Sequence, residues 1–147
     1  AGEFSPVFST MSNNNYQSMA GNYSTLSVVK QIRELKRNPQ LNGEEMIQLY
    51  KNHDEDVKNI LDDWFFAIAK FCYNIDCIIN PDCICIGGGI SSEPLFIQKI
   101  KENIDNIYEQ AFVFRKPMIV PCLYHNDSNL IGAFYTFCQK YKREVLK

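Results

Sequence analysis

Three consecutive glycines between an apolar run and a helix start limit what this chain can fold into. Residues 83–86, Cys-Ile-Cys-Ile, form a continuous apolar run that is typical of a parallel strand covered on both faces. Gly87, Gly88 and Gly89 follow, and the sequence Ser-Ser-Glu-Pro at 91–94 then provides a helix cap with proline in the first turn. The sequence therefore predicts a unit of strand, glycine turn and helix.

A second unit of the same kind comes next in the chain. Residues 117–123 are predicted to form a strand, 125–128 a loop with a cap, and 130–145 a helix. Strands that alternate with helices predict an α/β layer with parallel strands. The last helix is expected to bury one stripe of side chains, made of Leu130, Phe134, Phe137, Cys138, Tyr141 and Val145.

The rest of the chain is mainly helical by its apolar spacing. The strongest pattern runs from Asp54 to Ile79, where apolar residues recur every three or four positions, and it predicts a core helix. Shorter helices are predicted over 24–37 and after Asn42, where Glu45 completes a capping box. Residues 1–23 lack sustained periodicity, so we expect a strand and a loop there and an α/β lobe over 24–147.

Composition and charge exclude several classes of protein. The 147 residues carry 15 basic and 17 acidic side chains, which argues against general nucleic-acid binding, and 46% hydrophobic residues argue against disorder. No apolar run is long enough to span a bilayer and no signal-peptide pattern opens the chain, so a cytoplasmic protein is expected. The six cysteines are expected to be reduced core thiols, and Cys83 and Cys85 lack the two-residue spacing of a zinc site.

The glycine turn is the candidate ligand site. Bare backbone at the carboxyl end of a parallel strand lets a flat base or a ribose lie against the peptide planes. The segment is neither G-x-G-x-x-G nor a phosphate loop with Lys-Ser/Thr. Glu93, in the first helical turn, would repel a triphosphate, so adenosine is the expected occupant. The alternative is a glycine turn that only lets the strand and the helix pack.

Other polar residues give weaker signals. His53 and His125 are far apart in sequence and are expected on the surface. Asp62 and Asp63 occupy successive helix positions and do not face each other, so a paired-carboxylate site is not indicated. Taken alone, Glu3 is expected to be solvated.

Three segments together resemble the ROK family, bacterial sugar kinases and sugar-responsive repressors. Residues 80–91, Asn-Pro-Asp-Cys-Ile-Cys-Ile-Gly-Gly-Gly-Ile-Ser, are similar to the adenosine-side segment of the family, and 125–133 to its C-terminal loop and helix. Residues 1–4 resemble the start of its sugar-contacting Gly-Glu-x-Gly-His stretch, and the three segments come in family order. The resemblance implies the C-terminal lobe of an actin-like ATPase (ribonuclease H-like) fold, with parallel strands flanked by helices.

The resemblance also implies roles for individual residues. Glu3 would contact sugar hydroxyls, and the pocket for the adenosine of ATP would be lined by Gly87, Gly88, Gly89, Ile90 and Ser91. The catalytic Asp, the phosphate loop and the magnesium ligands of the family belong to an N-terminal lobe without counterpart here, so no catalytic residue or metal ligand is assigned. Ser5 and Pro6 replace the Gly-His of the family, and its zinc motif is absent.

The function implied is that of the C-terminal lobe of an ATP-dependent sugar kinase, which transfers the γ-phosphate of magnesium ATP to a sugar hydroxyl. This lobe alone is expected to be inactive, because phosphoryl transfer needs metal, phosphate and acceptor positioned together. The sequence leaves open whether the kinase forms a homodimer. One alternative is a sugar-sensing repressor of the same family, with a DNA-reading helix-turn-helix upstream. The other is a non-enzymatic oligomerisation or interaction module that uses the long aromatic helix.

Overall fold

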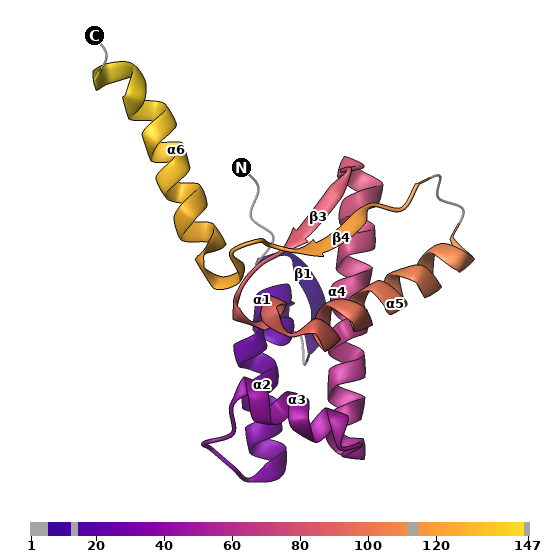
Figure 1. Cartoon of the computed structure of the whole chain (residues 1–147). Coiled ribbons are helices and arrows are strands. Elements are labelled where there is room, and N and C mark those ends of the chain that lie inside the picture. Colours follow the sequence, from indigo (N-terminus) through magenta and orange to yellow (C-terminus); the bar gives the residue numbers. More distant parts are fainter. Residues whose placement is uncertain (1–5, 13–14, 112–114, 146–147) are drawn as a thin grey trace. The chain divides into compact units, whose positions relative to one another are not determined.

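The computed structural model describes residues 6–12, 15–111 and 115–145 (Figure 1). Backbone contacts divide the chain into two compact units, Ala1–Phe71 and Cys72–Lys147. Helix α4, Glu55–Ile79, contributes residues to both units. Each unit is described by itself.

The first unit opens with a hairpin and a short helix. Strands β1, Phe8–Ser12, and β2, Asn15–Ser18, pair antiparallel, and α1 spans Met19–Tyr23. The hydroxyl of Ser18 accepts a hydrogen bond from the backbone N–H of Gly21 and so caps α1. The sequence predicted one strand and a loop here, and the structure adds the second strand and α1.

Helices α2, Thr25–Lys36, and α3, Gly43–Lys51, follow, and each begins after a residue whose side chain caps it. Ser24 caps α2 through a 3.2 Å hydrogen bond from the N–H of Ser27. Asn42 and Glu45 form the predicted capping box, in which each side chain accepts from the backbone of the other residue at 2.9 and 3.0 Å.

The N-terminal two thirds of α4 supply much of the buried apolar surface of this unit, as the sequence predicted. Trp64 and Phe65 are fully buried, and the indole N–H of Trp64 donates a 2.8 Å hydrogen bond to the carbonyl of Tyr23. The other buried apolar residues of the unit are Val28, Val29, Ile32, Leu41, Met46, Ile47, Val57, Leu61, Ala67 and Ala69.

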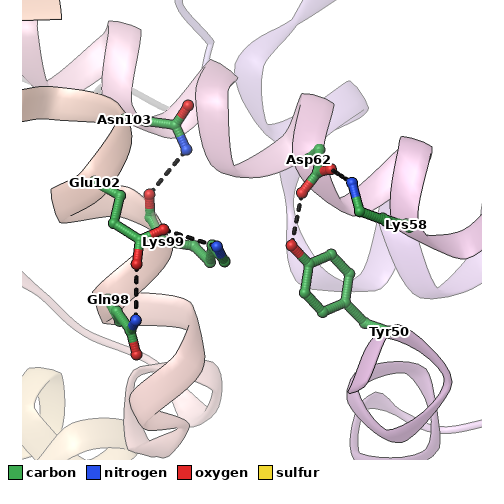
Figure 2. A network of polar contacts seen from close by, with 7 residues as sticks. All are labelled: Tyr50, Lys58, Asp62, Gln98, Lys99, Glu102 and Asn103. Atoms are coloured by element: carbon green, nitrogen blue, oxygen red, sulfur yellow. Dashed lines mark hydrogen bonds and ion pairs between the residues drawn. The ribbon is translucent and has the colours of Figure 1, made fainter. Parts of the chain in front are cut away.

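Asp62 on α4 belongs to a local polar network (Figure 2). Its carboxylate accepts a 2.7 Å hydrogen bond from the phenol of Tyr50 and a 2.5 Å bond from the ammonium of Lys58. The same carboxylate raises the pKa of Lys58. Asp62 therefore joins α3 to α4 as an ion-paired structural group.

The second unit contains the predicted strand, glycine turn and helix. Strand β3, Cys83–Ile86, leads through the glycines and a 3₁₀ turn, η1, Gly89–Ser92, into α5, Pro94–Gln110. Strand β4, Met118–Pro121, then pairs with β3 in parallel (Figure 1), with Cys83 opposite Met118 and Ile86 opposite Pro121. The predicted α/β layer with parallel strands is confirmed.

Figure 2 also shows the hydrogen bonds among polar side chains of α5. The carboxylate of Glu102 accepts 2.7 Å hydrogen bonds from Gln98 and from Lys99. The amide of Asn103 donates to the backbone carbonyl of Lys99 at 2.8 Å. The buried side of α5 carries Phe96, Ile97, Ile100 and Ile104.

Two predictions about burial in this unit are wrong. Strand β3 is not covered on both faces, since Cys85 is exposed and its neighbours are only half-buried. All six cysteines are free, but only Cys72 is buried, and its burial raises the pKa of the thiol to about 11. The remaining cysteines are exposed or half-buried, so they are not core thiols.

The last helix, α6, Ser128–Val145, forms where it was predicted, after a short turn, η2, His125–Asp127. Its apolar stripe is exposed rather than buried, and the exposed fraction is 73% for Leu130 and 67% for Phe134. Phe137 and Tyr141 are also exposed and Cys138 is half-buried, whereas the side chain of Val145 lies outside the described part. Helical periodicity identifies the apolar face, but it cannot show that another element covers it.

No helix within the described ranges is both long enough and apolar enough to cross a bilayer.

Candidate functional site

The three glycines of the turn have three different environments. Gly88 has φ of 86° and ψ of 168°, a backbone conformation that is essentially restricted to glycine. Gly87 lies beside the segment that follows β4, because a Cβ there would be 3.4 Å from the thiol sulfur of Cys122 and 3.8 Å from the carbonyl of His125. Gly88 thus has a conformational reason to be glycine, whereas a side chain at Gly87 would begin in ordinary contact with its neighbours.

Gly89 has neither the positive φ of Gly88 nor the close neighbours of Gly87. A Cβ built on Gly89 meets no atom within 4 Å, and its φ lies outside the positive range that disfavours side chains. A turn that served only to let β3 and α5 pack would tolerate a side chain at this position. The bare backbone at Gly89 is therefore open to a ligand.

A closed set of hydrogen bonds holds Gly88 to the loop that follows β4. The N–H of Gly88 donates to the carbonyl of His125 at 3.3 Å, and the hydroxyl of Ser91 donates to the carbonyl of Gly88 at 2.7 Å. Nδ1 of His125 lies 3.1 Å from the same hydroxyl oxygen, and Ser91 is only 2% exposed. The structure thus joins Gly88, Ser91 and His125.

The expectation that His125 is a surface residue is wrong, because the side chain is half-buried and bonded to Ser91. His53, in contrast, is exposed as expected. The signal that the sequence analysis missed was the position of His125 relative to the predicted strands. His125 and the glycine turn both follow the carboxyl ends of strands predicted to be parallel, and such ends meet at one edge of a sheet.

The start of α5 already carries a negative group. Glu93 is the N-cap residue, and its carboxylate accepts a 3.2 Å hydrogen bond from the N–H of Leu95. This carboxylate stands where an anion would otherwise be attracted to the positive end of the helix. A phosphate at that terminus would be repelled, whereas an uncharged nucleoside would not.

A groove beside the turn has a volume of about 620 Å³, within the range of small-molecule sites. Its lining includes Ser91, Ser92 and Pro94, which follow the glycines, and Pro121 and His125, which lie at and after the end of β4. Farther along α5 the lining carries one cation, Lys101, and two carboxylates, Glu102 and Asp105. The groove thus adjoins the turn on which the nucleoside is expected.

The remaining predicted site residues are placed as follows. Ile90 and Ser91 lie in η1, directly after the glycines. Glu3 falls outside the described residues. Within the part of the chain that the structure describes, no three His, Cys, Asp or Glu side chains form a group that could hold a metal ion.

Comparisons with known proteins match residues 16–140 to the ROK family. A β-glucoside kinase of Listeria monocytogenes is 31% identical over 116 residues, which cover 78% of this chain and 38% of the kinase. A xylose repressor of Lactiplantibacillus pentosus is 29% identical over 92 residues, covering 62% of this chain and 24% of the repressor.

The structure also matches a solved one. A ROK family protein from Streptococcus pneumoniae, crystallised with sucrose, superposes with a TM-score of 0.85 at 27% identity, over 97% of this chain and 50% of that protein. The chain thus spans half of this protein and less than two fifths of the β-glucoside kinase. Its parallel strands and flanking helices are those of half an actin-like ATPase fold. The predicted family is confirmed, and the chain belongs to the ROK family.

Proposed function

We propose that this chain is the C-terminal half of an ATP-dependent sugar kinase, which transfers the γ-phosphate of ATP to a sugar hydroxyl in the cytoplasm. The observation that carries the proposal is the bare backbone at Gly89, which has no packing or conformational reason to lack a side chain. A purine nucleoside can lie on such a surface at van der Waals distance, and any Cβ would hold it away.

The charges around the turn support binding of the nucleoside part of ATP. Glu93 caps α5 with a carboxylate, so the triphosphate would extend away from this helix. The groove beside the turn supplies polar atoms for the nucleoside from the exposed side chains of Ser92 and Gln98. Magnesium would then be held together with the phosphates by residues of the other half of the kinase.

The exposed face of α6 supports the proposal that this chain works with a second half. The face carries Leu130, Phe134, Phe137 and Tyr141, and contiguous apolar surfaces of this kind mark interaction sites. These relatives are more than twice as long as the segment that they share with this chain, so each contains additional protein outside the shared segment. We propose that such additional protein covers the face and supplies the general base for the sugar hydroxyl.

Within this assignment the residues of the chain bind and orient rather than react. The glycine turn would fix the adenosine of ATP, and Glu3 would accept hydrogen bonds from sugar hydroxyls. Correct placement of both substrates accounts for a large part of catalysis in phosphoryl transfer, because the transition state needs attacking and leaving oxygens in line. The isolated chain would have no measurable turnover.

The decisive experiment places a side chain on the proposed nucleoside surface. It is done in the full-length protein, meaning the longer kinase proposed to contain this chain. Gly89→Val points into open space at a backbone conformation that accepts side chains, so the fold should persist. We expect the KM for ATP to rise about tenfold or more, which corresponds to a loss of about 1.4 kcal/mol of binding. Gly43→Val is the matched control, since a Cβ at Gly43 also meets nothing within 4 Å.

An unchanged KM for ATP in Gly89→Val would overturn the nucleoside site. The assay also separates kinase from repressor. Formation of ADP that depends on β-glucosides or free hexoses supports the kinase. Binding of a sugar without ADP formation, together with sugar-dependent binding to DNA, would instead favour the repressor, as in the relative from Lactiplantibacillus pentosus. Gly88→Val is less suitable, because its φ of 86° makes any side chain strained.

A further inference from the structure

We propose that Ser91 and His125 are positioning residues that hold the glycine turn in its ligand-binding conformation. This inference rests on the proposed function, since it assumes that the turn receives the nucleoside. It starts from the three hydrogen bonds that link Gly88, Ser91 and His125 in a closed ring.

The direction of each bond in the ring is fixed by proton count. The carbonyl of Gly88 can only accept, so the single hydroxyl proton of Ser91 is donated to it at 2.7 Å. The Ser91 oxygen must then accept the 3.1 Å bond from Nδ1 of His125, which therefore carries a proton. Neutral His125 is the Nδ1–H tautomer, and its Nε2 is an acceptor.

The ring uses both backbone groups of Gly88. Its N–H is donated to the carbonyl of His125, and its C=O accepts from the hydroxyl of Ser91 at 2.7 Å and from the backbone N–H of Ser91 at 3.1 Å. Glycine adopts negative and positive φ with similar ease, so a conformation at φ of 86° needs contacts to hold it. The backbone bonds remain when the Ser91 or His125 side chain is removed, but because Ser91 is 2% exposed, water cannot easily replace the lost side-chain bonds.

The dihedral angles of Gly88 determine where the next peptide, that of Gly89, points. A nucleoside lying on Gly89 would bind best to a turn that is already in place, since ordering the turn on binding lowers affinity. Ser91 and His125 act on the ligand through Gly88 and need not touch it. They are therefore positioning residues and not catalytic residues.

The test measures the turn and the nucleotide separately in the full-length protein. Hydrogen exchange of the Gly88 and Gly89 amides is followed without nucleotide in Ser91→Ala, His125→Ala and the double variant. We expect exchange about tenfold faster in each single variant and no further increase in the double variant, because one ring is opened in each case.

Two further variants provide the controls. His125→Asn places an amide N–H near the position of Nδ1 and should return exchange to within about twofold of the wild type. His53→Ala removes the other histidine, which also has positive φ, 59° against 43° for His125, and should leave exchange of the turn unchanged. If Ser91→Ala does not fold, the comparison of His125→Ala with His125→Asn still tests the positioning role.

The KM for ATP separates the two proposals. Faster exchange in His125→Ala with a KM for ATP raised about fivefold or more, both reversed in His125→Asn, is the expected result. Unchanged exchange in His125→Ala and Ser91→Ala would overturn the positioning role, whatever the kinetics. Faster exchange with an unchanged KM would overturn the effect on nucleotide binding. Only an unchanged KM in Gly89→Val would also overturn the nucleoside site itself.

Discussion

The phenol of Tyr108 on α5 donates a hydrogen bond to Oδ2 of Asp76 on α4, and Asp76 is only 3% exposed. Oδ1 of Asp76 has no hydrogen-bond partner among the described residues. The ring of Tyr73 packs edge-on against Tyr108, with ring centres 5.3 Å apart. Since a buried carboxylate without partners is strongly unfavourable, the burial of Asp76 depends on Tyr108.

Tyr108→Phe should therefore lower the free energy of unfolding by about 1–3 kcal/mol, the usual effect of leaving a buried polar group unpaired. Urea denaturation followed by circular dichroism measures it. Tyr124→Phe removes a phenol that is more than half exposed and should change stability by less than about 0.5 kcal/mol. Equal effects of the two substitutions would show that the Asp76 contact does not stabilise the fold.

The same pair predicts a loss of stability at alkaline pH. Burial, and then the hydrogen bond to Asp76, raise the pKa of Tyr108 above its ordinary value of 10.0. The unfolded phenol ionises near pH 10 while the folded one stays protonated, so this contribution is complete below pH 10 and is lost as pH rises further. Urea midpoints between pH 9 and pH 11 should fall more steeply in the wild type than in Tyr108→Phe. Parallel slopes would contradict the prediction.

Local features of the fold could be predicted from the sequence. The capping box of Asn42 and Glu45 depends on two residues three positions apart, and the turn of Gly87 to Gly89 depends on adjacent ones. Such features are fixed by the geometry of a single segment. For this reason the starts of α3 and α5 lie close to the predicted positions.

Contacts between distant residues could not be predicted in the same way. His125 and Ser91 are 34 positions apart, and Asp76 and Tyr108 are 32 apart. Only the pairing of β3 with β4 brings His125 to the glycine turn, and a single sequence carries no signal for which side chains then meet. The alternation of strands and helices predicted the shared sheet edge, but not the hydrogen bond across it.

Removal of the helix cap tests the local part of the fold. In Asn42→Ala the N–H groups of Glu44 and Glu45 lose the side-chain oxygen that accepts from both at 2.9 Å. We expect the free energy of unfolding to fall by about 1 kcal/mol, the typical effect of deleting an N-cap. Asn59→Ala replaces an exposed asparagine within α4 and serves as the control. Identical melting curves for wild type and Asn42→Ala would refute the capping role.

Acid sensitivity should depend on Lys36 and Asp54. The ammonium of Lys36 lies 2.7 Å from both oxygens of Asp54, and this hydrogen bond lowers the pKa of Asp54 below its ordinary value of 3.8. The contribution is therefore complete above about pH 4 and is lost as pH falls below the ordinary pKa. Lys36→Met should flatten the dependence of the unfolding free energy on pH in this acidic range. A slope as steep as in the wild type would argue against the ion pair.

The exposed face of α6 predicts that one pair of substitutions affects stability differently in the chain by itself and in the proposed longer kinase. Phe134 and Phe137 are 67% and 58% exposed, so replacing both with Glu removes little buried surface from the chain by itself. The melting temperature of this double variant should stay within about 2 °C of the wild type. Light scattering should show less self-association, because the apolar surface then carries charge. In contrast, Phe65→Ala deletes a fully buried ring and should lower the stability by about 3–5 kcal/mol.

In the proposed longer kinase the face is covered, so the same two Glu substitutions would place charges in an apolar contact and lower the melting temperature and the activity. Gln139→Glu, at an exposed polar position of α6, adds charge outside that face and should do neither. A large loss of stability in the chain by itself would show that the face is already packed. Unchanged behaviour of the longer protein would show that no second half covers it.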